Sequence, residues 1–460
     1  MFMNRNIFIV FMIAGIMTLA GAPELYAQAA ETEQLKATVQ SLDQTVQELK
    51  LKVADLEKQK AFVLAEPPEG HLSPVINRNA FADNQEAAPR PDDLTLDPKY
   101  RGFIPIPHTA AMIKFNAKPR MDFILDTGNP GDPDRFVTAK IPVEGDPTKG
   151  GGSRFNVSAK GSQLKLDVRA PLTAGAPRFY YENDFFGPGS APLNFRIRHL
   201  YGQYYNIILG QTYSVFEDPD VWPDTLDYEG PNATVFARWP LLCYQLPLDK
   251  QWQLNFSVEK PSSEVDTSGD ASATAVNHAP DIGLNTRWEK ASFGHVQLAA
   301  IGRAIGADGQ TNGDQTVFGG GLSLSAVKSL FTRDSLQLQG TLGQGIARYD
   351  NDDFFNNDAA YNQSGDLKAL PYLGVMVGYT HGWAEKWRST ATYGLVNINN
   401  EISQGPTAYH RTQYASLNLM WQPLKLLTVG VEGLYGHKEA QSGATGADWR
   451  IQFGVVYSLF

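Results

Sequence analysis

The sequence predicts an all-β membrane protein: a transmembrane antiparallel β-barrel of about 16 strands, preceded by an N-terminal α-helical coiled coil. Three observations support this fold. They are an export signal at the N-terminus, alternation of apolar and polar residues over most of the chain, and a closing strand that alternates up to Phe460. The mean hydropathy of -0.29 and the 19% of charged residues are ordinary for a soluble protein. A membrane barrel has such values too, because only every second residue of each strand faces lipid.

Residues 1–29 are predicted to be a secretory signal peptide. Arg5 precedes an uncharged apolar run from Ile7 to Ala22, and the small-residue pattern Ala27-Gln28-Ala29 follows it. The run is shorter than the ~20 apolar residues that a spanning helix needs, which disfavours a permanent N-terminal anchor.

Charge and cysteine content narrow the functional classes. The net charge is -10, and no basic patch with interleaved aromatic residues occurs, so we expect no binding of nucleic acid. The single cysteine, Cys243, cannot form an intramolecular disulfide. An exported chain must then gain its stability elsewhere, and a closed β ladder can supply it.

Residues 30–65 are predicted to form a periplasmic coiled coil. Apolar residues recur at alternating steps of four and three: Leu35, Val39, Leu42, Val46, Leu49, Val53 and Leu56. This heptad pattern favours self-association over a single amphipathic helix packed within its own domain, since no helical neighbour follows in sequence. Val alternating with Leu mildly favours two helices over three, but so short a seam leaves the stoichiometry open. Residues 66–108 are polar and rich in proline, and they are predicted to be an extended linker.

From residue 109 to residue 460 the periodicity is two, as expected for the strands of a barrel. One face of the first predicted strand is apolar: Ile113, Phe115, Ala117, Pro119, Met121, Phe123 and Leu125. The opposite face is polar: Lys114, Asn116, Lys118, Arg120, Asp122 and Asp126. Pro119 cannot donate to the ladder, so a bulge is expected there. A second irregularity is expected at 160–162, where the apolar positions change parity.

The predicted connections sort by length. Short turns at 247–250, 289–292, 383–387 and 423–425 alternate with longer loops at 259–280, 303–315, 348–368 and 399–411. Short periplasmic turns and long extracellular loops alternate in this way in outer-membrane barrels of even strand number.

The closing strand predicts both the targeting of the chain to the outer membrane and which of its residues face the barrel interior. Its outer face is apolar: Trp449, Ile451, Phe453, Val455, Tyr457 and Leu459. Its end is similar to the C-terminal signal that the outer-membrane barrel assembly machinery reads, so this machinery is an expected partner. Arg450 and Gln452 have the opposite parity and are predicted to face the same interior as Lys114 and Arg120.

Several short motifs resemble one known family. They are Gly102-Phe103-Ile104-Pro105-Ile106-Pro107, Ser153-Arg154-Phe155, Asp184-Phe185-Phe186-Gly187, Asn194-Phe195-Arg196-Ile197-Arg198-His199, Tyr201-Gly202-Gln203, Gly210-Gln211-Thr212 and Thr225-Leu226-Asp227-Tyr228-Glu229-Gly230-Pro231. The chain resembles the DcaP-like porins, a family of trimeric outer-membrane channels with an N-terminal coiled coil. It departs from the family pattern at Asn116-Ala117 and at Tyr213. The resemblance implies a sixteen-stranded homotrimer that admits small organic anions, dicarboxylates above all.

A constriction is predicted where the third extracellular loop, 217–233, folds into the barrel. This loop is acidic and aromatic, with Asp218, Trp222, Asp224, Asp227, Tyr228 and Glu229. Cationic residues of inward parity are predicted to form a wall opposite it: Lys114, Lys118, Arg120, Lys165, Arg169, Arg196, Arg198 and Arg287. Guanidinium groups donate two parallel hydrogen bonds to a carboxylate, and rings of Arg or Lys form anion pores. The alternative is that these cations only pair with Asp122, Asp167, Glu182 and the loop acids.

Patterns that would indicate an enzyme are incomplete. Phe123 to Gly128 has the shape of an aspartic protease motif, but the second copy that such a protease needs is missing. His295 and Ser292 do not make the constellation of an outer-membrane lipase. Asp350, Asp352, Asp353 and Asp358 lack the spacing of a calcium loop and are expected to form a solvated loop facing lipopolysaccharide. We therefore expect no catalysis, metal or cofactor.

The sequence thus predicts a passive porin for small anionic solutes in the bacterial outer membrane, with its coiled coil in the periplasm. Lipid and lipopolysaccharide are its expected surroundings. The alternative is a structural anchor or adhesin whose coiled coil binds peptidoglycan. The pair Arg196 and Arg198 disfavours it, because a plugged anchor has little use for two inward cations.

Overall fold

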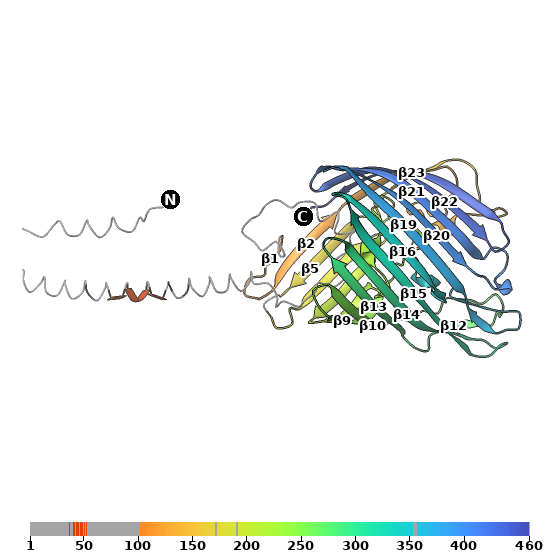
Figure 1. The fold of residues 1–460 in the computed structure, drawn as a ribbon, viewed down its shortest axis with the longest axis horizontal. Coiled ribbons are helices and arrows are strands. Elements are labelled where there is room, and N and C mark those ends of the chain that lie inside the picture. Colours follow the sequence, from red (N-terminus) through yellow and green to blue (C-terminus); the bar gives the residue numbers. More distant parts are fainter. Residues whose placement is uncertain are drawn as a thin grey trace, which may run out of the picture. The chain divides into compact units, whose positions relative to one another are not determined.

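The computed structural model describes residues 102–170, 173–189, 192–352 and 357–459, with scattered positions between 36 and 52 (Figure 1). The predicted signal peptide, the linker up to residue 101 and Phe460 lie outside the described residues. Two units, Met1–Ala65 and Glu66–Phe460, are described separately. In the first, the described positions are helical, but every apolar position of the predicted coiled-coil seam lies outside them. In the described part of the chain, no helix is long and apolar enough to span a membrane.

The second unit is dominated by one large sheet, which has 20 strands (Figure 1). Its strands up to the middle of the chain are β1 (Ile104–Pro105), β2 (Met112–Lys118), β3 (Arg120–Asp126), β4 (Arg154–Ser158), β5 (Gln163–Arg169), β6 (Arg178–Asp184), β7 (Arg196–Tyr204), β8 (Ile207–Tyr213), β9 (Arg238–Pro247) and β10 (Trp252–Glu259). The remaining strands are β12 (Thr274–Val276), β13 (Asp281–Lys290), β14 (Gly294–Asp308), β15 (Gln315–Leu330), β16 (Asp334–Gln344), β19 (Pro371–Ala384), β20 (Trp387–Ile398), β21 (Tyr409–Leu424), β22 (Leu427–Ala440) and β23 (Thr445–Tyr457). Long strands with alternating side chains favour this sheet because each one pairs on both edges.

Smaller elements lie in the connections between these strands. A separate sheet contains β11 (Val265–Asp266), β17 (Ala359–Tyr361) and β18 (Leu367–Ala369), with β11 parallel to β17. Four short 3-10 helices are η3 (Thr138–Lys140), η4 (Pro219–Val221), η5 (Ala347–Tyr349) and η6 (Ile402–Gln404).

The large sheet closes on itself, because its last strand pairs with one of its first. β23 is antiparallel to β3, with Arg450 opposite Asp126 and Phe453 opposite Phe123. Closure removes the open edges that would otherwise offer unpaired backbone groups. Just beyond this seam, β1 pairs with β2, where Ile104 lies opposite Ile113.

The irregularity predicted at 160–162 is confirmed; at Pro119 the ladder is interrupted, but the inward parity does not change, since Lys118 and Arg120 are both buried. Pro119 separates β2 from β3, because proline has no N–H to donate to the ladder. On the neighbouring strand, β4 ends at Ser158 and β5 begins at Gln163. The exposed apolar positions accordingly change from Phe155 and Val157 to Leu164.

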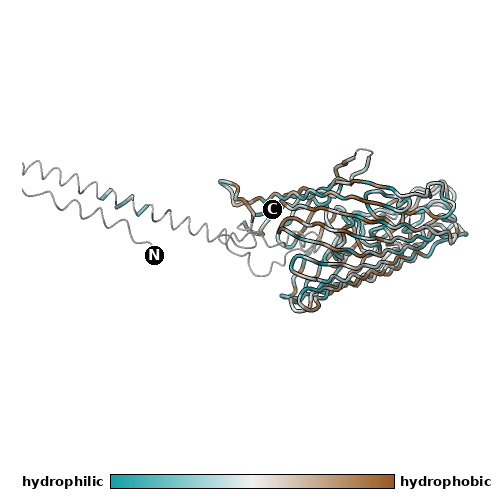
Figure 2. The backbone as a smooth tube through the Cα atoms, turned by 90° about the horizontal axis from the view of Figure 1, so that it is seen from above, coloured by the Kyte–Doolittle hydropathy of each residue, from teal (hydrophilic) through white to brown (hydrophobic). Residues whose placement is uncertain are grey.

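The predicted division into an apolar outer face and a polar inner face is also confirmed. Phe115, Phe123 and Phe453 are exposed, whereas their neighbours Asn116 and Gln452 are buried. Figure 2 shows brown and teal segments alternating along the strands of the sheet. The side with the buried polar residues is the interior of the closed sheet. In a membrane barrel the outer face is apolar because it contacts lipid, and the interior is polar.

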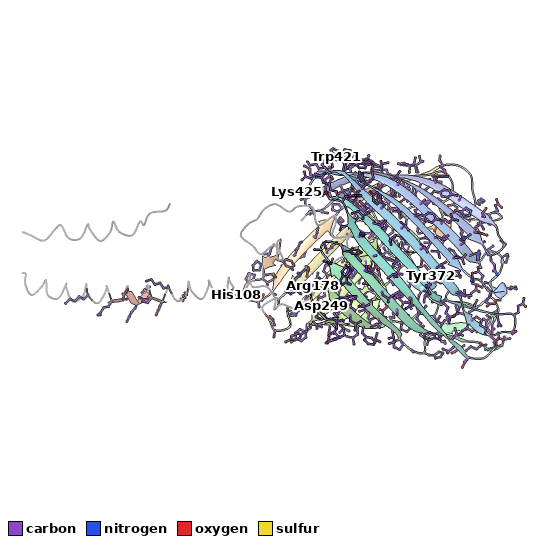
Figure 3. The ribbon with its side chains drawn as sticks, viewed as in Figure 1. His108, Arg178, Asp249, Tyr372, Trp421 and Lys425 are labelled. Carbon is purple, nitrogen blue, oxygen red and sulfur yellow. The ribbon has the colours of Figure 1, made fainter. Side chains whose placement is uncertain are left out.

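Short turns and long connections lie at opposite ends of the strands. Asp249 and Lys425 belong to short turns, while Tyr372 lies near the other end of its strand (Figure 3). Trp387 and Trp421 stack at the short-turn end with ring centres 5.5 Å apart. The predicted loop 303–315 is shorter than expected, because β14 continues to Asp308 and β15 begins at Gln315. We call the two ends of the sheet the short-turn end and the long-loop end.

The acidic loop near residue 350 differs from the sequence prediction. Asp350, Asp352 and Asp358 are buried rather than solvated. Asp358 accepts a 2.7 Å hydrogen bond from Arg303, and Asp352 accepts one of 2.6 Å from Thr138. These carboxylates hold the long-loop end together, because a buried carboxylate needs hydrogen-bond donors around it.

Candidate functional site

The connection between β8 and β9 crosses the interior of the closed sheet. We call residues 214–237 the interior loop; it contains the predicted constriction loop, 217–233. On one side Asp218 accepts hydrogen bonds from Arg287 of β13 (3.1 Å) and Ser325 of β15 (2.5 Å). His295 of β14 lies 2.8 Å from the same carboxylate. One loop carboxylate is therefore bonded to three successive strands.

The second half of the interior loop reaches other strands. The backbone N–H of Asp227 donates to Glu432 of β22 at 2.6 Å, and Arg388 of β20 donates to Asp224. The Tyr228 hydroxyl donates to Asp184 of β6 at 2.8 Å. Since these partners lie on well-separated strands of the closed sheet, the loop lies across its interior.

Several acids of the interior loop form ion pairs. Asp218 and Asp220 share Arg287, at 3.1 Å and 2.6 Å, and Glu229 pairs with Arg135 at 3.0 Å. Trp222 packs on Phe236 with ring centres 4.7 Å apart. The alternative left open by the sequence, that the predicted cations pair with loop acids, applies to Arg287. Because Asp218 and Asp220 share one guanidinium, this pair of acids keeps part of its negative charge.

Burial affects the two acids beside Arg287 differently. Burial raises the pKa of Asp220 to about 6, although Arg287 opposes the rise. For Asp218 burial acts in the same direction, but His295 and Arg287 hold its pKa below its ordinary value. Asp220 is therefore the acid of this pair that gains a proton under mildly acidic conditions.

Half of the predicted basic wall gathers around Glu182, Asp184 and Tyr228: Arg120, Lys165, Arg196 and Arg198. Arg196 and Arg198 both pair with Asp184, at 2.6 Å and 3.1 Å. Arg198 also pairs with Glu182 at 2.6 Å, and Lys165 lies 3.7 Å from the same carboxylate. A β-bulge in the pairing of β6 with β7 lies beside Arg198.

Tyr228 joins this group of cations to the interior loop. The guanidinium carbons of Arg120 and Arg198 lie 5.4 Å and 5.5 Å from the centre of the Tyr228 ring. The ring also stacks on Phe186, with centres 4.7 Å apart. The Tyr228 hydroxyl accepts a 2.8 Å hydrogen bond from Arg198. An aromatic ring between guanidinium groups stabilises like charges that would otherwise repel each other.

The other predicted cations lie elsewhere. Arg169 pairs with Asp167 at 2.7 Å and lies 5.0 Å from the centre of the Phe103 ring. Lys114 is opposite Asp167 in the register of β2 and β5, and Lys118 is buried opposite Gln163. Arg287 is not part of this group, because the interior loop binds it on β13.

Arg238, the first residue of β9, was missed by the sequence prediction. Its guanidinium carbon lies 4.4 Å from the centre of the Phe236 ring and is close enough to Arg196 and Arg198 for their charges to repel it. Among the described residues it has no ion pair, and its buried Nη1 has no hydrogen-bond partner. The parity of the following strand would place it outside with Pro240 and Leu242. The interior loop turns it inward instead, which alternation alone does not reveal.

Together these residues form what we call the arginine cluster: Arg196, Arg198 and Arg238, with Lys165, Tyr228, Glu182 and Asp184. Four cations face two carboxylates, so the cluster has an excess of positive charge. It contains donors suited to an oxyanion, and in the described part of the chain no group of side chains is arranged to hold a metal ion. The Asp126 of the protease-like motif is bound to Arg450 at 2.6 Å, which gives it a structural role.

The closed sheet with its interior loop defines a porin-type outer-membrane barrel. A family model described as DcaP outer membrane protein matches residues 76–459, and the chain belongs to this family. It is thus a non-enzymatic outer-membrane porin, as predicted.

Comparisons with solved structures agree on the fold. The crystal structure of the outer membrane channel DcaP of Acinetobacter baumannii has a TM-score of 0.66 at 22% identity, over 76% of this chain and 97% of that one. Salmonella typhi OmpF in complex with daunomycin has a TM-score of 0.50 at 11% identity, over 77% and 100%. A search of curated proteins found no significant match.

Proposed function

We propose that this porin is a passive diffusion channel for small organic anions, with dicarboxylates as its preferred solutes. The observation that carries the proposal is Arg238, a guanidinium inside the closed sheet with no carboxylate partner among the described residues, beside the paired Arg196 and Arg198. An inward cation without a counterion attracts anions from solution.

The arginine cluster suits a carboxylate in both strength and geometry. Arg196 and Arg198 are held in place by Asp184 and Glu182, so their positions are fixed before a solute arrives. The Nη1 group of Arg238 then offers a donor that has no hydrogen-bond partner among the described residues. A carboxylate that binds there loses water of hydration and gains charge-assisted hydrogen bonds. The second carboxylate of a dicarboxylate is attracted by the positive charge of the neighbouring residues. The solute moves down its own gradient without covalent chemistry.

The proposal includes an assembly. We infer sixteen membrane-crossing segments, taking β2 with β3 and β4 with β5 as one each and leaving out the short β1 and β12. We further propose that the working unit is a homotrimer, with the signal peptide removed and the coiled coil in the periplasm. The support is the membership of the DcaP family together with the heptad pattern of residues 35–56.

Planar-bilayer recording tests the channel function directly. The purified full-length protein should insert with conductance steps in groups of three, and its reversal potential in a salt gradient should show anion preference. Succinate should block the current more strongly than butyrate, because both have four carbons but succinate has twice the charge. Silent insertion, or strong cation preference, would contradict the proposed function.

The selectivity should also depend on pH through Asp220. Its pKa of about 6 means that it gains a proton between about pH 7.5 and pH 5, while Arg287 keeps its charge. The interior loop then becomes more positive, so the preference for anions should rise as the pH falls. Reversal potentials at both pH values measure this change. Asp220→Asn lacks this titrating charge and should respond less; an equal response in that variant would show that another group is responsible.

A further inference from the structure

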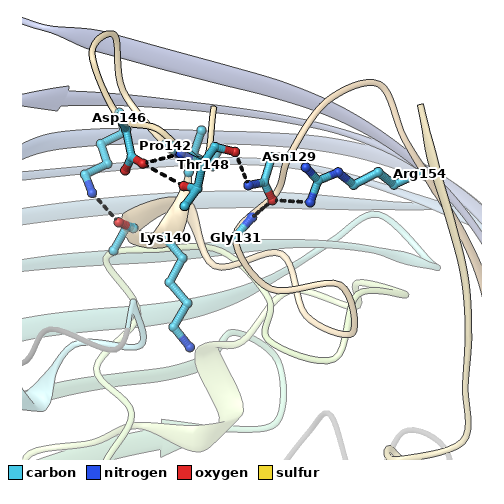
Figure 4. Close-up of a pocket in the computed structure, with 10 residues that line it drawn as sticks. Asn129, Gly131, Lys140, Pro142, Asp146, Thr148 and Arg154 are labelled. Atoms are coloured by element: carbon cyan, nitrogen blue, oxygen red, sulfur yellow. Dashed lines mark hydrogen bonds between the residues drawn. The ribbon is translucent and has the colours of Figure 1, made fainter. Parts of the chain in front are cut away.

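A polar cavity lies at the long-loop end (Figure 4). It is bounded by the β3–β4 connection, the start of β4 and the end of β22. Its volume is about 660 Å³, and it is lined by Lys140, Arg154 and Lys438 together with Asp146, Asn129 and Thr148. A volume of this size is in the range of pockets that hold small ligands. The arginine cluster does not contribute to its lining.

Two of the cations that line the cavity have inward parity on their strands. On β4, Phe155 and Val157 are exposed on the outer face, so Arg154 has the opposite, inward parity. On β22, Lys438 shares the parity of the buried Glu432 and Leu434. These two cations of the lining therefore lie on the inward-parity side of their strands, at the long-loop end of the sheet.

Two of its cations have no carboxylate partner among the described residues. Arg154 donates a 2.8 Å hydrogen bond to the Asn129 side-chain oxygen, and Lys438 donates one of 2.6 Å to the Ala139 carbonyl (Figure 4). Lys140 is 3.4 Å from Asp132. The one acid that lines the cavity, Asp146, already accepts hydrogen bonds from the Thr148 N–H and hydroxyl, at 2.8 Å and 2.7 Å. The cavity therefore has more positive than negative charge.

The wall of the cavity is held in shape before any ligand arrives. Gly131 has φ of 75°, and a Cβ at this position would lie 2.0 Å from the Lys140 carbonyl oxygen. Only glycine fits such an approach of two backbone segments. Glu144 and Thr445 join the connection to β23 through a 2.9 Å backbone hydrogen bond. A preformed site loses less conformational entropy when it binds a ligand.

We propose that this cavity is an outer capture site for small solutes with carboxylate or phosphate groups. It holds them at the long-loop end before they reach the arginine cluster. The inference rests on the proposed anion channel and adds a second anion-binding site, separate from the arginine cluster. Opposite charge at a mouth raises the local concentration of a solute and its rate of association, whereas the dissociation from a deeper site is unaffected.

The test is the rate of succinate block in single channels, measured with succinate added to one side and then to the other. The variant is Arg154→Gln/Lys438→Gln, and the matched control is Lys368→Gln, an exposed cation of the long-loop end that does not line the cavity. From one side only, the double variant should lower the association rate by about three- to tenfold. The dissociation rate should remain that of the wild-type protein, and the control should change neither rate.

Three results would overturn the capture site. The first is an unchanged rate, and the second is an equal loss from both sides, which would indicate a general change in electrostatic field. The third is an effect seen only in bilayers that contain lipopolysaccharide, since the cavity would then hold a lipid phosphate; the proposal requires the effect in phospholipid alone. If the wild-type channel shows no succinate block at all, the proposed function fails instead, so the two failures are distinguishable.

Discussion

Arg238→Gln should weaken succinate block and lower the preference for anions while leaving the barrel folded. A unit charge about 5 Å from a bound carboxylate is worth about 0.8 kcal/mol even at the dielectric constant of water, which corresponds to about a fourfold change in occupancy. Interior sites have lower effective dielectric constants, so fourfold is a lower bound. The measurement is the concentration of succinate that halves the current, with the reversal potential as a second readout.

The reason to choose Arg238 is that its removal leaves no carboxylate behind. Among the described residues it has no ion pair, whereas Arg198 pairs with both Glu182 and Asp184. Arg198→Gln would leave Glu182 without its 2.6 Å guanidinium partner and Asp184 with Arg196 alone, so it should reduce the yield of folded protein as well as anion binding. It cannot separate the two effects, but Arg238→Gln can.

A matched control makes the Arg238 result specific. Arg333→Gln makes the same chemical change at an exposed position of a short turn, between β15 and β16. It should leave block and selectivity at wild-type values. If Arg238→Gln also left both at wild-type values, Arg238 would not be in contact with the permeating anion. The main structural support for the proposed function would then be removed.

Arg450→Met should destabilise the barrel at the seam where the sheet closes. Arg450 has a fully buried side chain that pairs with Asp126 at 2.6 Å and donates to the Asp132 carbonyl at 3.0 Å. It also lies 3.9 Å from Asp227 of the interior loop. Removal of one partner from a buried ion pair costs about 3–5 kcal/mol, because the remaining charge loses its counterion. Urea unfolding of the refolded protein in detergent micelles or lipid should show this loss.

Two further variants distinguish a broken ion pair from a general defect of the closing strand. Arg450→Met/Asp126→Leu removes both partners of the 2.6 Å ion pair and should recover part of the lost stability, since Asp126 no longer leaves an unpaired charge at the seam. Asp227 loses Arg450 in both variants, so its contribution cancels in the comparison. Lys425→Met, on an exposed short turn, should behave like the wild-type protein. If the double variant were less stable than Arg450→Met, the seam would depend on Arg450 through packing and not through its charge.

Alternation along the strands predicted most of the fold for a physical reason. A strand between lipid and a polar interior must present one kind of side chain to each, so the pattern at Phe123 and Phe453 is visible in the sequence itself. The break between Ser158 and Gln163 was predictable too, because a change of parity has to occur where the ladder is interrupted.

Other features of the site needed tertiary structure. The sequence predicted an acidic loop and left open whether its acids pair with cations; in the structure Asp218 and Asp220 share Arg287, and Glu229 pairs with Arg135. These partners are distant in sequence, and no local pattern pairs them. The buried state of Asp350 and Asp352 was likewise invisible, since their composition alone resembles that of a solvated loop.

The sequence by itself determined that this chain forms β strands with an apolar outer face and a polar inner face, and it predicted that Arg196 and Arg198 lie on the inner one. Alternation is local information, because it depends only on which side of a strand each residue lies. Only the tertiary structure decided which of those cations keep a carboxylate partner and that Arg238 does not. Ion pairing depends on the path of the interior loop, which is set by contacts with strands far away in the chain.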